Sequence, residues 1–280
     1  MTGPENHMHG DEEEKDSRWK SEDARAEEIA KHGIQNVTAE HPHAVEAAMA
    51  NKPKALTCID ERAGPAAGER GESCSMGCAG CGIMIDIEGA KRFIDGGEAS
   101  PKLKEFFVKC KAMGITHVYP HEKCGAADAF AKTIGKEGEG RHFALAWANA
   151  LAKEIGATVT MVNVEPEGFH DARAIYWDAT VDGRFNPGVS DVFLRGFHVS
   201  ECVMGRDQAS AEVGVATNIA FDGHHGFGDR FTPEKPLIVI VVAHTQEEAE
   251  ERRARVDGRG GRVVAHTLVV PKPVDQAKAA

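Results

Sequence analysis

The sequence lacks the features of membrane-bound and exported proteins. Its longest apolar run, Leu237 to Ala243, has the length of a buried strand and falls far short of the roughly 20 residues that span a bilayer. The N-terminus shows no basic segment followed by an apolar one, so we expect no secretory signal. No internal repeat is visible either. We therefore expect a cytoplasmic protein with no membrane partner.

The chain also lacks an excess of basic residues. Its formal net charge is −11, and residues 1–50 contain 12 Asp/Glu against 5 Lys/Arg. This balance argues against nucleic acid as the main partner, because binding to phosphates depends on Lys and Arg. Residues 1–20 are polar and include the run Asp11-Glu12-Glu13-Glu14. We expect a disordered acidic tail there.

Disulfides are not expected. The chain has seven cysteines, an odd number, and no export signal, a combination that favours metal or thiol chemistry over a disulfide framework. A hydrophobic share of 41% in 280 residues is enough for one large domain with a real core.

The pattern of helix signals divides the chain. Residues 21–52 are expected to form an N-terminal helical arm, with Ser21 as an N-cap, Gly33 past the end of the first helix, and a short second helix at 43–51. The apolar faces of these helices are modest, so the arm should pack on the domain or on a partner subunit. Residues 53–270 then form one α/β domain, followed by a loose tail at 271–280.

Strand and helix signals alternate in that domain. An apolar strand over 55–59 precedes a helix that starts at Ser100-Pro101, and a second strand follows over 115–119. A strand, a helix and a strand at this spacing form a parallel crossover. Further strands are expected at 158–164, 237–243 and 263–270, and 174–180 should return as a hairpin at Arg184-Phe185. We predict a central, mostly parallel sheet flanked by helices.

Two polar segments follow two of these strands. Cys58-Ile59-Asp60-Glu61-Arg62 ends the first strand, and His121-Glu122-Lys123-Cys124-Gly125 ends the second. The carboxyl ends of parallel strands meet at one edge of a sheet, where ligands bind. Cys58, His121 and Cys124 therefore form a candidate Cys2His set, which suits zinc with one position left open.

Two further side chains belong to the same segments. Asp60 lies two residues beyond Cys58, so it can reach the same side. Arg62 can form a bidentate pair with Asp60 and keep it ionised. Asp60 could then orient a zinc-bound hydroxide, or it could bind zinc itself as the fourth ligand.

Together the two segments resemble the β-class carbonic anhydrases, over roughly residues 45–165. The resemblance implies that Cys58, His121 and Cys124 bind Zn²⁺ and that Asp60 and Arg62 form the catalytic dyad. It implies reversible hydration of carbon dioxide to bicarbonate by zinc-bound hydroxide, in a homodimer whose N-terminal helices wrap the partner. Backbone N–H groups near Gly80 and Gly125 are candidates for holding bicarbonate.

The chain departs from the family pattern at one motif segment, and the chain after Phe185 has no counterpart in the family. Cys78-Ala79-Gly80-Cys81-Gly82 stands where the family has Arg-Asn-Ala-Gly, so the substrate pocket differs. Relatives of this fold also hydrolyse carbonyl sulfide or carbon disulfide, and these substrates remain alternatives.

Other readings compete with a carbonic anhydrase. The spacing Cys74-x3-Cys78-x2-Cys81 is typical of iron–sulfur loops in radical enzymes. The same cysteines could instead hold a second zinc, act as redox thiols, or only fill a tight glycine-rich turn. Asp222, His224 and His225, with Cys202, form a weaker metal candidate. A non-catalytic zinc scaffold that binds partners through the acidic arm is a third hypothesis.

Overall fold

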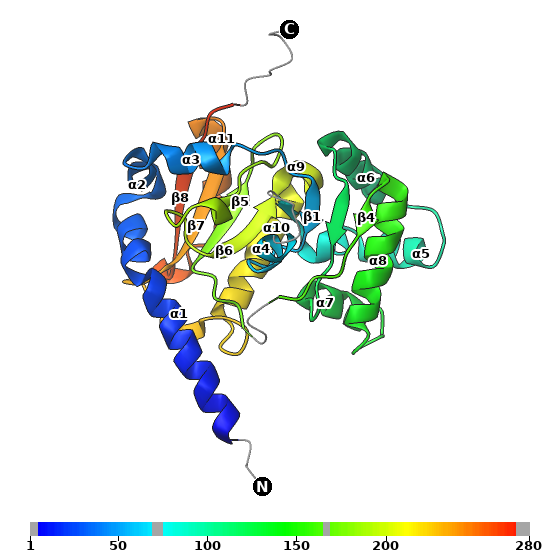
Figure 1. Cartoon of the computed structure of the whole chain (residues 1–280), viewed down its shortest axis with the longest axis horizontal. Coiled ribbons are helices and arrows are strands. Elements are labelled where there is room, and N and C mark those ends of the chain that lie inside the picture. Colours follow the sequence, from blue (N-terminus) through cyan, green and yellow to red (C-terminus); the bar gives the residue numbers. More distant parts are fainter. Residues whose placement is uncertain (1–4, 69–74, 165–168, 273–280) are drawn as a thin grey trace.

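The computed structural model describes residues 5–68, 75–164 and 169–272 and has an α/β fold (Figure 1). Two four-stranded sheets lie side by side, and within each sheet every strand pairing is parallel. Helices flank both. The prediction of a parallel α/β fold is confirmed, but two sheets replace the single sheet expected from the sequence. No helix in the described ranges is both long and apolar enough to cross a membrane.

The first sheet has the strand order β2-β1-β3-β4. Its strands are short: β1 Ala55–Thr57, β2 Ser75–Gly77, β3 His117–Tyr119 and β4 Thr158–Val159. The helices between them are α4 Ala63–Gly68, α5 Ile87–Ile94, α6 Pro101–Met113, α7 Gly125–Thr133 and α8 Gly140–Ile155. Helix α6 begins where Ser100 Oγ accepts the Leu103 N–H and ends at the left-handed Gly114, as the sequence predicts.

The second sheet has the order β6-β5-β7-β8. Its strands are β5 Ala174–Asp178, β6 Gly196–Ser200, β7 Leu237–Ala243 and β8 Val263–Val269, with helices α9 Glu201–Met204, α10 Arg206–Phe221 and α11 Gln246–Arg253. If β5 is matched to β1, both sheets have the same strand order. The architecture therefore contains a repeat that is not visible in the sequence.

The two sheets meet at their edge strands, β2 and β6. The Gly77 N–H donates to Ser200 Oγ at 3.1 Å, and the His198 N–H donates to the Ile59 carbonyl at 3.0 Å. A Cβ atom on Gly77 would lie only 1.8 Å from the His198 carbonyl oxygen. Only glycine lets the two backbones approach this closely.

The N-terminal helices pack on the second sheet of their own chain. These helices are α1 Glu5–His32, α2 Ile34–Ala39 and α3 Pro42–Ala48, and Ile29, Ile34 and Val37 join the core beneath them with β7 side chains. The arm thus packs on the domain, which was one of its two expected positions. Homodimer formation stays a prediction.

The structure differs from the expected tail at residues 1–20, because α1 already begins at Glu5. Charged side chains of this segment form ion pairs: Arg18 with Glu14 at 3.1 Å, and Arg18 with Asp171 at 2.9 Å. The guanidinium carbon of Arg173 lies 3.5 Å from the centre of the Trp19 ring. Contacts with the second sheet therefore hold this helix in place.

The hairpin predicted at Arg184-Phe185 is wrong, because β5 pairs only with the parallel strands β6 and β7. Phe185 is instead buried against the Tyr176 ring. Strands β2 and β6 were missed. Strand β2 has only three residues, Ser75-Met76-Gly77, and shows no strand pattern. Strand β6 alternates Phe197 and Val199 with polar residues, but two apolar residues are too few for a strand to be recognised from the sequence.

Candidate metal centre

Cys58, His121 and Cys124 come together where β1 and β3 end. Their ligand atoms all lie within 4.8 Å of one another. The two sulfur atoms are 3.8 Å apart, and all three side chains are buried. The group could hold a metal ion, as the strand-end argument predicts.

The orientation of His121 suits a metal ligand. Its Nδ1 lies 2.8 Å from the Glu122 carbonyl oxygen, to which it can donate a proton. This contact selects the tautomer with a lone pair on Nε2, a common arrangement in metal sites. Nε2 is buried and has no hydrogen-bond partner. An unpartnered buried nitrogen is costly unless a ligand satisfies it.

Electrostatics favour a thiolate at Cys58. The hydrogen bond with Cys124, and next the contact with His121, lower the pKa of Cys58 well below its ordinary value. The same hydrogen bond raises the pKa of Cys124. Burial lowers the pKa of His121, but the interactions with Cys58, Asp60 and the Glu122 carbonyl outweigh burial and bring that pKa to about 9 without a metal. A metal ion at Nε2 would therefore displace a proton from this ring. Thiolate is the form of cysteine that binds metals.

The residues fit a tetrahedral metal ion. Two sulfurs that are each about 2.3 Å from such an ion would be about 3.8 Å apart, which matches the separation of the Cys58 and Cys124 sulfurs. Two thiolates and one imidazole leave the fourth position without a ligand from this set.

Asp60 and Arg62 lie beside the Cys2His group. Arg62 Nε donates to Asp60 Oδ1 at 2.8 Å and Nη2 donates to Oδ2 at 2.7 Å, which forms the expected bidentate pair. Burial raises the pKa of Asp60, but the Arg62 hydrogen bonds outweigh it and keep that pKa below its ordinary value. Asp60 Oδ2 is 3.8 Å from His121 Nε2. The carboxylate therefore faces the open side of the group.

Glu61 and His170, which have no role in the sequence prediction, extend the network around Asp60 and Arg62. Glu61 accepts hydrogen bonds from His170 Nδ1 at 2.9 Å and from the Asp171 N–H at 3.0 Å. With Asp60 they form a second group with metal-ligand atoms. The Arg62 guanidinium already binds both carboxylate oxygens of Asp60 there, and its positive charge would repel a metal cation at this group. This second group is better described as a closed ion-pair network.

Nothing in the sequence near His170 pointed to this contact. It lies 109 positions from Glu61, on the segment between the two sheets. Arg62 Nη1 also donates to the carbonyl oxygen of the neighbouring Phe169 at 3.1 Å. Only the three-dimensional fold brings this segment to the strand end.

The structure does not group Cys78 with Cys81 as metal ligands. Cys78 Sγ contacts Glu212 at 3.8 Å, whereas Cys81 Sγ points to the carbonyl oxygens of Leu56 and Tyr119. Burial raises the pKa of both thiols well above the ordinary value. Cys74 lies outside the described residues. Among the residues described, no metal-binding group includes Cys78 or Cys81.

The Gly80 N–H donates to Cys58 Sγ at 3.3 Å. A role in binding substrate for the N–H groups near Gly80 stays a prediction. Gly125 is the first residue of α7, next to the ligand Cys124. It remains a candidate for contacting substrate.

The other histidine-rich loop is held by backbone contacts. Asp222 Oδ1 accepts the N–H groups of His224 and His225, both at 2.8 Å. Cys202 instead contacts the Met76 sulfur at 3.4 Å. No metal-binding group from this loop is found among the described residues.

Among the residues that the structure describes, the second sheet has no equivalent of the Cys2His group. Tyr119 pairs with Thr57 in the first sheet, and Val242 pairs with Asp178 in the second. Counting two residues onward from Tyr119 and from Val242 gives His121 and His244. The histidine is therefore repeated, but alanine follows β5 where Cys58 follows β1, and Thr245 caps α11 where Cys124 precedes α7.

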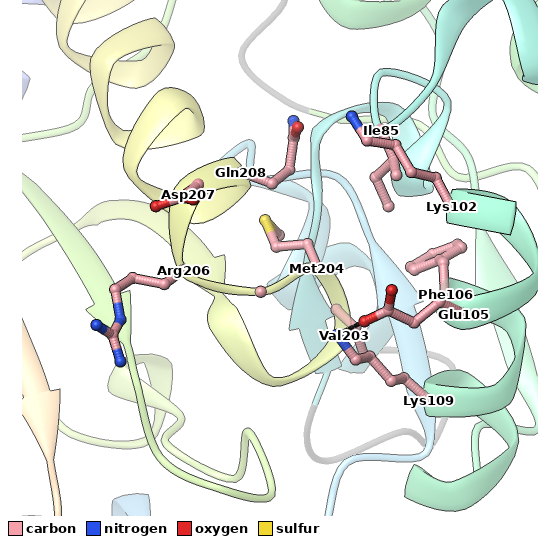
Figure 2. A pocket seen from close by; sticks show the side chains of 11 residues that line it. Ile85, Lys102, Glu105, Phe106, Lys109, Val203, Met204, Arg206, Asp207 and Gln208 are labelled. Atoms are coloured by element: carbon pink, nitrogen blue, oxygen red, sulfur yellow. Dashed lines mark ion pairs between the residues drawn. The ribbon is translucent and has the colours of Figure 1, made fainter.

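A cavity of about 440 Å³ lies away from this centre, between α6 and the segment that joins α9 to α10 (Figure 2). Its lining includes Lys102 and Lys109 of α6 and Arg206 of α10. Lys109 is paired with Glu105 at 2.8 Å, and Arg206 is paired with Glu251. None of the Cys2His residues lines it.

Comparisons with protein-family models, with curated proteins and with solved structures give no match for this chain.

Proposed function

We propose that this protein is a zinc enzyme that reversibly hydrates carbon dioxide to bicarbonate. The observation that carries the proposal is the open side of the Cys2His group. There, the unpartnered His121 Nε2 lies 3.8 Å from a carboxylate oxygen of Asp60. The resemblance of both motifs to β-class carbonic anhydrases supports the same assignment.

Cys58, His121 and Cys124 would hold the metal. Thiolate and imidazole ligands suit zinc better than magnesium, calcium or manganese. Zinc bound there would act as a Lewis acid that lowers the pKa of a water molecule to about 7.

Asp60 and Arg62 would direct the reacting water. Arg62 binds both oxygens of Asp60 and fixes the carboxylate in one orientation. Asp60 can accept a hydrogen bond from a water molecule on the open side and so determine where its lone pair points. Hydration requires this oxygen to add to the carbon of CO2 while a proton leaves to solvent.

The same arrangement could serve carbonyl sulfide or carbon disulfide, because both present an electrophilic carbon to the same nucleophile. No contact of the described residues favours sulfur over oxygen in the substrate. We therefore keep carbon dioxide as the proposed substrate and include the other two in the test.

Stopped-flow CO2 hydration at pH 7 to 9 by the zinc-loaded protein tests the proposal. Cys58→Ser should lose zinc and activity together. Asp60→Asn should keep zinc but lose at least about 100-fold in kcat, as expected when a reacting group is misplaced. Asp178→Asn is the matched control, because Asp178 is an equally buried aspartate in the second sheet.

An inactive zinc-loaded protein in this pH range would contradict the proposal. Turnover of carbonyl sulfide or carbon disulfide without CO2 hydration would reassign the enzyme to the related hydrolases. Zinc binding without turnover of any of the three would favour the scaffold hypothesis.

A further inference from the structure

A short loop from the first sheet touches the metal centre through its backbone. Residues 78–82 follow β2, and the Gly80 N–H donates to Cys58 Sγ at 3.3 Å. Hydrogen bonds to a ligand orient it and tune its affinity for the metal. This loop is therefore the immediate surrounding of one proposed ligand.

The loop needs support, because its backbone is strained. Gly80 has φ 56° and Cys81 has φ 55°. The left-handed region suits glycine but is unfavourable for cysteine. Such a conformation persists only where surrounding contacts impose it.

Glu212 supplies that support from α10, the helix that lies between β6 and β7 of the second sheet in the chain. Its Oε2 accepts the Ala79 N–H at 2.8 Å. Its Oε1 contacts Cys78 Sγ at 3.8 Å and Gln208 Nε2 at 3.3 Å. The N–H groups of Ala79 and Gly80 are consecutive. One is bound to Glu212, and the next is bound to Cys58.

Glu212 lies in an apolar environment, where burying a carboxyl group costs free energy unless the group has a specific role. The side chain is 2% exposed, and Ala209, Val213 and Ala216 on the same helix are buried in an apolar core. Burial raises the pKa of Glu212 to about 7. An apolar residue would pack there without the cost of removing a carboxyl group from water.

We propose that Glu212 is a positioning residue for the metal centre. By fixing the peptide at Ala79, it holds the Gly80 N–H against Cys58 Sγ and so sets the orientation and metal affinity of that thiolate. The second sheet, which lacks its own Cys2His group, thereby completes the site of the first. This inference rests on the proposed metal centre but not on the identity of the substrate.

Binding of Co²⁺ to the full-length protein tests this role without measuring activity. Cobalt reports thiolate ligands through charge-transfer absorption. Glu212→Ala should weaken Co²⁺ binding about 10- to 100-fold, as is typical for residues that support a ligand, and should shift the thiolate band. Glu212→Gln should retain wild-type affinity within about threefold, because its amide oxygen can still accept the Ala79 N–H.

Two more variants guard against misreading a loss of stability. Glu212→Asp keeps the charge but withdraws the carboxylate by one methylene, so it should weaken Co²⁺ binding to the extent expected for Glu212→Ala. It provides the same test if the alanine variant does not fold. Glu201→Ala is the matched control. Glu201 is a mostly buried glutamate that accepts from Trp177 Nε1 at 2.8 Å and does not touch the loop. It should leave the cobalt spectrum unchanged.

Wild-type cobalt affinity and spectrum in Glu212→Asp would overturn the proposal, as would a Glu212→Gln variant as impaired as Glu212→Asp. A wild-type protein that binds neither Co²⁺ nor Zn²⁺ would remove the metal centre and this inference together. If the variants change Co²⁺ binding as predicted but the zinc-loaded wild type does not hydrate CO2, the role of Glu212 is supported and only the proposed reaction is contradicted.

Discussion

The pairing of Arg62 with Asp60 can be tested by removing the guanidinium group of Arg62. Arg62→Met keeps most of the apolar stem but leaves the buried Asp60 carboxylate without its guanidinium partner. It also removes the hydrogen bond from Nη1 to the Phe169 carbonyl oxygen at 3.1 Å. The change therefore removes the charge and the side-chain hydrogen bonds that hold Asp60 in place, together with one contact to the segment before β5.

The expected loss follows from burial. The Arg62 and Asp60 side chains are only 10% and 3% exposed. Removing one partner of a buried ion pair typically costs about 3–5 kcal/mol, because the remaining charge is left without compensation. His170, whose Nδ1 is 3.8 Å from Asp60 Oδ1, can offset only part of this loss. We expect a decrease of about 3 kcal/mol or more in the free energy of unfolding.

Urea unfolding of metal-free protein at pH 7 measures this loss. Arg141→Met is the control, because Arg141 forms an equally short contact with Glu122 at 2.6 Å but is 66% exposed. An exposed pair contributes about 0–1 kcal/mol. If Arg62→Met destabilises the protein no more than Arg141→Met, the Asp60–Arg62 pair is not the buried, stabilising contact described above.

Three further perturbations test other parts of the structure. Gly77→Ala should lower the unfolding temperature strongly, because the added Cβ would clash with the His198 carbonyl. The control Gly214→Ala in α10 has open space around its added Cβ and should be neutral or stabilising by up to about 1 kcal/mol. Burial raises the pKa of Glu212 from 4.5 to about 7, so its contribution to stability is full below pH 4.5 and is lost as the pH rises through 7. Wild type should therefore lose up to about 3 kcal/mol relative to Glu212→Gln between pH 4.5 and 8 in urea unfolding, and a constant difference would contradict the burial of this carboxyl group. Cys124→Ser should abolish stoichiometric zinc binding in metal analysis while Cys202→Ser retains it, and equal zinc contents would contradict the ligand set.

The centre of the candidate site could be predicted because its determinants are local. Cys58 and Asp60 follow one apolar strand, and His121 and Cys124 follow another. In a parallel sheet both ends lie at the same edge, and here they meet because β1 and β3 are neighbouring strands. The spacing between Asp60 and Arg62 similarly predicted their pairing.

The surroundings could not be predicted, because they depend on long-range packing. Glu212 and His170 reach the site from segments more than 100 positions away. The repeated sheet order escaped detection for a related reason. Strand pairing is made by backbone groups, so β5 and β7 can adopt the arrangement of β1 and β3 with different side chains.

X-ray absorption at the zinc edge of the loaded protein tests the central claim most directly. The proposed ligands predict two sulfur atoms at about 2.3 Å and at least one imidazole nitrogen at about 2.0–2.1 Å around one zinc per chain. Three or four sulfur neighbours would contradict this ligand set, because it contains only two cysteines. A shell without sulfur would contradict the site at Cys58, His121 and Cys124.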